Sequence, residues 1–251
     1  MEKPAIIGLD RRTTAEQIAS VLRKRIFAGM IEPGKSVREI PLAEMLGVSR
    51  NTLREALRSL AMEGLIQHSL HRGVTVTLLL EEDITDIYRT REHIELLAVN
   101  AIGSNAAREA KLEPMREALD QMKTAEQKGD WQALADADLE FHAQLVALLG
   151  RPRLNVFFRK MFGELRLALI LHDSATRMPV GYLKSHRLLY DLLLSGNKQE
   201  CRAALIDHLA EAETALKNIV AEVSRKREPK RATRSGDGAK GESGNGPGVS
   251  T

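Results

Sequence analysis

Apolar residues recur every three or four positions along most of this chain, the spacing that places them on one face of a helix. In the segment 50–62 this face consists of Leu53, Ala56, Leu57 and Leu60. The pattern therefore predicts a helix with one side against a core, and the polar positions of that helix remain free for solvent or a partner.

The residues just before this segment predict a tight turn between two helices. Gly47 can adopt the positive φ that such a turn requires, and Ser49 is a favourable N-cap for the next helix. The segment 42–46 supplies the preceding helix, which we expect to begin near Glu39 because Pro41 suits the first turn of a helix. Two helices joined in this way form a helix-turn-helix.

The region after this pair of helices predicts a β-hairpin. Residues 65–68 and 74–77 are the two strands, and the second has the β-branched alternation typical of strands. Residues 69–73 form the tip, which carries His71 and Arg72. A two-stranded hairpin directly after a helix-turn-helix indicates a winged helix, whose basic tip would lie along the DNA backbone or minor groove. An ordinary hairpin is the alternative.

From about residue 79 the strand-like pattern ends and helical segments follow one another. Glycine and proline mark the breaks between them, as in Gly150-Arg151-Pro152. The predicted fold class is mainly α, with an N-terminal winged helix-turn-helix and a C-terminal all-helical bundle of six or seven helices. The bundle helices are expected at 83–106, 112–128, 131–149, 153–172, 180–195 and 198–224.

These changes of pattern divide the chain into four parts. Residues 1–12 are expected to be a flexible arm, and 13–78 a winged helix-turn-helix domain whose first helix covers about 14–28. Residues 79–224 form a helical domain long enough to bury its own core. Residues 225–251 are rich in Arg, Lys, Gly, Ser and Pro, so they predict a disordered basic tail.

Composition restricts the class of protein. The chain has 251 residues, of which 43% are hydrophobic and 28% charged, as in globular proteins. Its net charge of +3 does not by itself imply nucleic acid, so the position of the basic residues must carry that argument. The one cysteine, Cys201, excludes a disulfide within the chain and fits a reducing compartment. Without a membrane-length apolar run or a signal-peptide pattern, we expect a cytoplasmic protein with no membrane partner.

The polar face of the predicted helix 50–62 carries candidate DNA contacts. Arginines in the first turns of such a helix can reach phosphates and guanine edges in the major groove. A merely solvated helix is the alternative, and the complete helix-turn-helix context favours DNA binding over it. With the turn and the wing, the candidate DNA-binding residues are Ser49, Arg50, Asn51, Thr52, Arg54, His71, Arg72 and Gly73.

The helical domain contains a candidate metal site. Asp138 and His142 are four residues apart, which places both side chains on one face of a helix. His186 and His208 lie in two further predicted helices. One carboxylate and three imidazoles that meet in a bundle core suit a divalent ion, zinc first, with nickel or manganese as alternatives. On spacing alone, such histidines are more often ordinary core or surface residues.

Arg91 is a charged residue in the middle of an otherwise apolar helix face, near Ile87, Ile94 and Leu97. An arginine that points inward can hold the carboxylate of a ligand by two parallel hydrogen bonds. A salt bridge to Glu95, four residues further on, explains it equally well.

These motifs resemble a known family. Residues 48–57, 63–65 and 72–74 are similar to the winged helix of GntR-type bacterial transcription regulators. The helical part resembles the FCD-type ligand-binding domain of the FadR subfamily, and the resemblance covers about residues 12–222. It implies a homodimer that binds a short palindromic double-stranded DNA operator, usually as a repressor.

The resemblance also implies roles for individual residues. Family effectors are typically small organic acids bound partly through the metal, beside an arginine that matches Arg91. Members that bind fatty acyl-CoA lack the metal ligands, so these ligands argue against that effector. One departure is Ile40, which stands where many members carry an arginine, with Arg38 two residues earlier. The family's DNA contacts match Arg50, Thr52 and Arg54 together with the wing tip, and its metal ligands match Asp138, His142, His186 and His208.

Two other functions use some of the same residues. A metal with open coordination positions can activate water, so a metal-dependent enzyme is one alternative. The sequence shows no general base for such a reaction, and an enzyme would leave the winged helix unexplained. A DNA-binding regulator with a purely structural metal and no effector is the other. The sequence favours a non-enzymatic regulator controlled by a small carboxylate.

Overall fold

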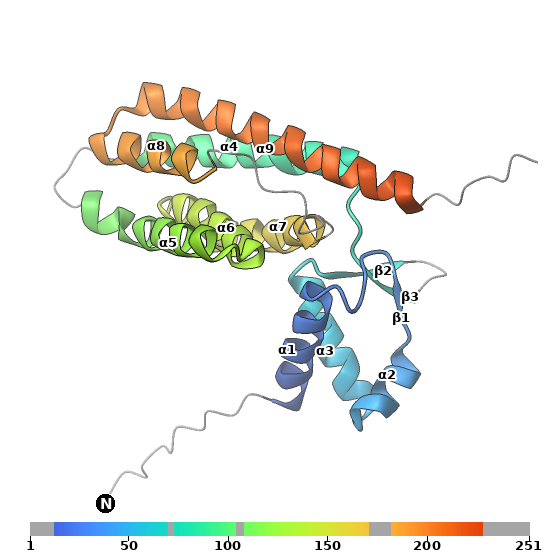
Figure 1. Cartoon of the computed structure of the whole chain (residues 1–251). Coiled ribbons are helices and arrows are strands. Elements are labelled where there is room, and N and C mark those ends of the chain that lie inside the picture. Colours follow the sequence, from blue (N-terminus) through green and yellow to red (C-terminus); the bar gives the residue numbers. More distant parts are fainter. Residues whose placement is uncertain (1–12, 70–72, 104–107, 171–181, 228–251) are drawn as a thin grey trace, which may run out of the picture.

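A small N-terminal unit and a larger helical unit make up the computed structural model (Figure 1). The structure describes residues 13–69, 73–103, 108–170 and 182–227, which form nine helices and three short strands. All three strands belong to the N-terminal unit, which lies beneath the helical unit in Figure 1. The predicted fold class, a winged helix-turn-helix followed by a helical bundle, is confirmed.

The helices of the N-terminal unit differ in their capping groups, and one of them begins without a side-chain cap. They are α1 (Thr14–Phe27), α2 (Glu39–Leu46) and α3 (Arg50–Met62). Gly47 ends α2 in the left-handed conformation, with φ 65°, so the predicted reason for a glycine in this turn is confirmed. A side chain with a Cβ atom would be strained at this φ, because the left-handed region favours glycine.

The sheet has one strand more than the sequence pattern indicated. Strands β1 (Ser36–Val37), β2 (Ile66–Ser69) and β3 (Gly73–Val76) form an antiparallel sheet in the order β1-β3-β2. The prediction of a two-stranded hairpin was therefore incomplete. A two-residue strand is too short to show an alternating pattern, and β1 forms only because it pairs with β3, in the register Val37 opposite Val74.

The helical unit consists of two layers. Figure 1 shows α4, α8 and α9 in one layer and α5, α6 and α7 in the other. No helix among the described residues is long and apolar enough to cross a membrane. The bounds of the six helices are α4 Glu81–Ala101, α5 Arg108–Lys128, α6 Trp131–Ala147, α7 Pro152–Ile170, α8 Tyr182–Ser195 and α9 Lys198–Arg227.

Three of the predicted helix bounds were wrong by three residues or more. Helix α4 ends before the predicted residue 106 because Ile102 has an extended backbone, with ψ 117°. Helix α5 begins at Arg108 and contains Pro114, whereas the prediction had placed this proline in the first turn. Helix α9 continues through Arg227, beyond the predicted start of the tail at residue 225. The predicted arm and the rest of the predicted tail lie outside the described residues.

The two units contact each other through α7. Leu167 of α7 is buried in the core of the N-terminal unit. Gly163 lies against the turn after α3, where a Cβ atom would collide with the carbonyl oxygen of Glu63. The guanidinium carbon of Arg166 lies 3.7 Å from the centre of the Phe27 ring. Through these contacts of α7, a displacement in the helical unit could reach the helices of the N-terminal unit.

Candidate nucleic-acid interface and metal centre

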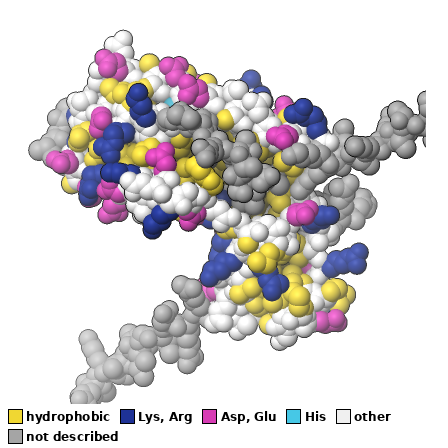
Figure 2. Space-filling model, viewed as in Figure 1, with side chains coloured by type: hydrophobic (Ala, Val, Ile, Leu, Met, Phe, Trp, Pro, Cys, Tyr) yellow, Lys and Arg dark blue, Asp and Glu magenta, His cyan; other side chains and the backbone are white. Residues whose placement is uncertain are grey.

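The buried face of α3 fixes the position of its polar face. Leu53, Ala56, Leu57 and Leu60 are all buried in one core, so the predicted amphipathic helix is confirmed. The opposite side of the helix is accessible. Figure 2 shows more lysine and arginine than acidic side chains on the visible face of the N-terminal unit.

The first turn of α3 combines capping groups with exposed polar groups. The backbone N–H of Thr52 donates to Ser49 Oγ at 3.1 Å, and the two side-chain hydroxyls lie 2.7 Å apart. Ser49 is therefore the N-cap that the sequence predicted. Arg50 and Asn51 are exposed beside it, so their side chains can reach a partner without unfolding the helix.

Arg54 has a protein partner that sequence reasoning did not identify. Its Nε donates to Glu39 Oε2 of α2 at 2.7 Å, which ties the two motif helices together. A guanidinium has further N–H groups, so this ion pair leaves donors for DNA. Arg38 is exposed at the N-cap of α2, and Ile40 is exposed as well.

Only part of the predicted wing tip can be described. Gly73 opens β3 with φ 69°, a conformation that favours glycine. His71 and Arg72 lie outside the described residues. The contacts predicted for these two side chains therefore remain predictions.

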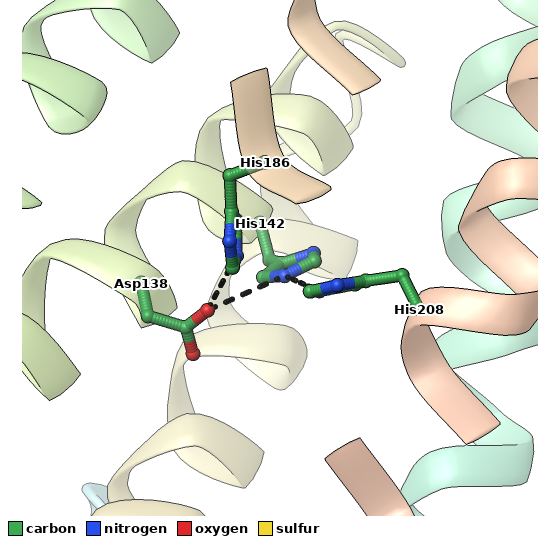
Figure 3. Close-up of side chains that lie close together, drawn as sticks. All are labelled: Asp138, His142, His186 and His208. Carbon is green, nitrogen blue, oxygen red and sulfur yellow. Dashed lines mark hydrogen bonds and ion pairs between the residues drawn. The ribbon is translucent and has the colours of Figure 1, made fainter. Parts of the chain in front are cut away.

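Four buried side chains from three helices converge in the helical unit (Figure 3). Asp138 and His142 lie on α6, His186 on α8 and His208 on α9. Their ligand atoms all lie within 4.8 Å of one another. His142 and His186 are 0% exposed, and Asp138 and His208 are 6% exposed. The structure thus brings together the complete set that the sequence suggested.

Each of the three imidazoles has its Nδ1 atom at hydrogen-bond distance from a second group. Such contacts fix the ring orientation and determine which nitrogen carries the proton. A carboxylate or a carbonyl oxygen only accepts, so in the neutral imidazoles of His142 and His186 the proton lies on Nδ1, and Nε2 presents a lone pair. The contacts join His142 to Glu95 Oε2 (2.6 Å), His186 to the carbonyl oxygen of Tyr182 (2.8 Å) and His208 to Ser185 Oγ (3.1 Å).

The Nε2 atoms point at each other and at a carboxylate. His142 Nε2 lies 3.2 Å from His208 Nε2. His186 Nε2 lies 2.6 Å from Asp138 Oδ1, but the two atoms lack the alignment of a hydrogen bond, and this nitrogen has no hydrogen-bond partner in the described residues. Two unprotonated nitrogens 3.2 Å apart repel unless a proton or a metal ion lies between them. The donor set therefore fits a divalent metal ion.

The ionisation states of the cluster suit a metal ion. Burial and the neighbouring His186 and His142 lower the pKa of His208 to about 2, so its imidazole is neutral. Burial raises the pKa of the Asp138 carboxyl, but the contacts with His142 and His186 outweigh it and hold that pKa well below its usual range. Burial lowers the pKa of His142, but the contacts with Glu95 and Asp138 raise it overall, so a metal ion would displace a proton from this imidazole. Neutral imidazoles and an ionised carboxylate are the forms that bind metals.

Arg91 forms the salt bridge that was one of the two interpretations of the sequence, and its contact with an effector stays a prediction. It is buried, and its Nε donates to Glu95 Oε1 at 2.9 Å, so the salt bridge is present. Its guanidinium carbon lies 4.8 Å from the ring centre of Tyr88 and 5.3 Å from that of Phe162. Its Nη2 has no hydrogen-bond partner among the described residues. One buried, charged donor group thus remains available to a ligand.

Sequence reasoning missed the groups that orient the histidines. Glu95 was considered only as a partner of Arg91, although it also contacts His142. A signal for it exists, because Tyr88, Arg91, Glu95 and Ala98 recur at helical spacing on the buried face of α4. The carbonyl of Tyr182, four residues before His186 in α8, is a backbone group that no residue type marks, and the contact of Ser185 with His208 depends on the packing of α8 against α9.

Comparison with known proteins identifies the class of protein. Residues 14–76 match the bacterial regulatory proteins of the gntR family, and residues 86–211 match the FCD domain. The chain therefore belongs to the GntR family of bacterial transcription regulators, which bind DNA, and it carries an FCD domain. This confirms the family resemblance drawn from the sequence.

Individual relatives cover most of the chain. It is 30% identical over 205 residues to the probable D-xylose utilization operon transcriptional repressor of Paenarthrobacter nicotinovorans, covering 80% of this chain and 88% of that protein. It is 28% identical over 204 residues to the gluconate operon transcriptional repressor of Bacillus licheniformis, with coverage of 80% and 82%. The crystal structure of a putative GntR transcriptional regulator from Rhodococcus sp. RHA1 is 32% identical, with a TM-score of 0.69 and coverage of 80% and 96%.

Proposed function

We propose that this chain is a repressor that binds a palindromic operator as a homodimer and responds to a small organic acid at a metal site. The observation that carries the proposal is the buried convergence of Asp138, His142, His186 and His208 in the FCD domain of a DNA-binding regulator. The names of two relatives, both transcriptional repressors of operons, support repression.

The DNA-binding part is placed at residues 13–78. Each winged helix of the dimer inserts α3 into the major groove of one half-site, and the spacing of the half-sites follows the two-fold axis. Exposed Arg50 and Asn51 contact the DNA first, because they lie at the N-terminal end of α3. The other residues of this proposed interface are Ser49, Thr52, Arg54, His71, Arg72 and Gly73.

The effector-binding and dimerisation part is placed at residues 79–224. Asp138, His142, His186 and His208 hold the ion, with zinc as the first choice and nickel or manganese as alternatives. A divalent ion there supplies a Lewis-acidic centre that accepts a carboxylate oxygen. The buried, unpartnered Nη2 of Arg91 supplies a hydrogen-bond donor for the same acid.

The buried charges favour an anionic effector. The ionised groups around the site are Asp138 and Glu95, each −1, and Arg91, +1, which sum to −1. A divalent ion changes this sum to +1. A single carboxylate restores neutrality in a site from which water is largely excluded, where an uncompensated charge is costly. A neutral ligand of the same size would leave the positive charge unbalanced.

Control of DNA binding requires that the acid prefer one arrangement of the two units. Helix α6 carries Asp138 and His142, and it also carries Asp136, which pairs with Arg166 of α7 at 2.6 Å. Arg166 in turn lies over Phe27 of α1. This chain of contacts runs from the metal ligands to the N-terminal unit. Allosteric coupling of this kind is typically about 1–3 kcal/mol, or roughly 5–150-fold in affinity.

The test begins with an operator selected by the purified protein from a random DNA pool. Its affinity is then measured by fluorescence anisotropy with zinc and a panel of sugar acids, di- and tricarboxylates, and neutral sugars. We expect at least one acid, and no neutral sugar, to weaken operator binding by roughly 5–150-fold, and only when metal is present. Arg91→Lys keeps the charge but removes the fork of parallel donors, so it should reduce the response.

Two results would contradict this proposal. If no acid changed operator affinity, the metal would be purely structural. If nuclear magnetic resonance showed conversion of an acid by the metal-loaded protein, the chain would be an enzyme. We propose that the metal takes part in effector binding, that the chain is not an enzyme, and that it acts on DNA in the cytoplasm.

A further inference from the structure

We propose that Glu95 is a positioning residue of the metal centre: it holds His142 in the orientation and tautomer that a metal ion requires, and Arg91 holds Glu95. The inference rests on the proposed function, because it presupposes that the cluster around His142 binds a metal. Glu95 is not one of the four residues whose ligand atoms converge, so it acts through His142.

Both oxygens of this carboxylate are used. Glu95 is completely buried, with Oε2 2.6 Å from His142 Nδ1 and Oε1 2.9 Å from Arg91 Nε. A buried carboxylate is stable only when it is paired, because burial removes its hydration. The guanidinium of Arg91 supplies this pairing on one side of the carboxylate, and the imidazole of His142 supplies it on the other. One side chain thus links the metal ligand to the arginine.

The contact with Glu95 determines what His142 can do. A carboxylate that pairs with Arg91 accepts from His142, so the proton of the neutral imidazole lies on Nδ1, and Nε2 is left with the lone pair that a metal binds. Without this acceptor the ring can rotate or carry its proton on Nε2, which blocks coordination. The corresponding partners of His186 and His208 are a neutral carbonyl and a neutral hydroxyl, so His142 alone of the three is oriented by a charge.

Two substitutions of Glu95 distinguish the effect of its side-chain length from the effect of its charge. Glu95→Gln keeps the length of the side chain but loses the charge and offers an N–H₂ group to one of its two partners. Glu95→Asp keeps the charge, but it is one methylene shorter and cannot contact His142 and Arg91 together. A positioning role predicts that both variants lose zinc affinity, by roughly 10–100-fold. A purely electrostatic role predicts that Glu95→Asp binds zinc like the wild type.

The measurement is zinc affinity of the full chain, by competition with a chromogenic chelator. Glu82→Gln is the matched control, because Glu82 is exposed on the same helix and should leave the affinity unchanged. Circular dichroism and operator binding without effector show whether each variant is folded, and Glu95→Asp provides the test if Glu95→Gln is not. Wild-type zinc affinity in either variant would overturn the positioning role while leaving the proposed function intact. Failure of the wild type to bind zinc, nickel or manganese would overturn both.

Discussion

The two units of this protein place their candidate functional residues in opposite environments. In the N-terminal unit the apolar residues of α3 are buried, and Arg50 and Asn51 are exposed on its other side. In the helical unit the polar residues themselves are buried, where three helices meet. A DNA contact therefore needs only one well-placed helix, whereas the metal centre needs the packing of a whole domain.

This difference has an energetic consequence. Exposed side chains contribute little to stability, so they can be replaced with an effect on binding alone. Buried polar side chains are tied to the core, so their environment affects folding and binding together. The predictions below test this separation, in order of decreasing free-energy change.

The largest effect is expected from Phe141→Ala. This ring is completely buried, and its centre lies 5.5 Å from that of His142 and 5.2 Å from that of His186. Its removal should cost about 3–5 kcal/mol of stability and weaken metal binding. Urea unfolding followed by circular dichroism measures the first, and chelator competition the second. Phe157→Ala is the control, because Phe157 is 51% exposed. A stability loss no greater than in the control would contradict the role assigned to the buried ring.

Metal removal should lower the stability of the helical unit almost as much as Phe141→Ala. A ligand that binds only the folded state stabilises it by about 4 kcal/mol when its free concentration is ~1000 times its Kd. A chelator such as EDTA should therefore lower the melting temperature, and added zinc should restore it. Because Arg50 is remote from the cluster, Arg50→Ala should show the same shift as the wild type. Equal melting curves with and without chelator would argue against a bound ion.

Arg50→Ala should weaken operator binding and leave the metal centre and the stability unchanged. Loss of a guanidinium that contacts base edges typically costs about 1–3 kcal/mol, or roughly 5–150-fold in affinity for the specific site. Metal content and melting temperature should not change, because the side chain is exposed. Lys123→Ala, an exposed cation of α5, serves as the control. Full operator affinity in Arg50→Ala would show that α3 is not the recognition helix.

The smallest effect is expected from Ser49→Ala. Loss of this N-cap should cost ~1 kcal/mol, since the N–H of Thr52 loses its acceptor. Operator affinity should fall as the start of α3 frays and as the proposed interface loses the hydroxyl of Ser49. Ser59→Ala, in the same helix, is the comparison, because the hydroxyl of Ser59 donates to Glu63 Oε1 over the longer distance of 3.4 Å and is no N-cap. If both variants were equally stable, the capping role of Ser49 would be wrong.

The same difference between the two units explains how much of each could be predicted from the sequence. Helix α3, its N-cap Ser49 and the left-handed Gly47 are determined by neighbours in the chain, so local patterns were sufficient. Strand β1 depends on pairing with a distant strand, and two residues carry no periodicity. The four candidate ligands could be named from residue type and family resemblance, but their convergence results from the packing of α6, α8 and α9. The double contact of Glu95 required the structure for the same reason.

Metal content of the purified protein, by elemental analysis of the wild type and His186→Ala, tests the central claim most directly. Circular dichroism of both proteins verifies that the substitution leaves the fold intact. The account predicts about one divalent ion per wild-type chain and its loss in His186→Ala, since His186 contributes one of the four converging donors. Absence of metal from the wild type, even after addition of zinc, nickel or manganese, would contradict it.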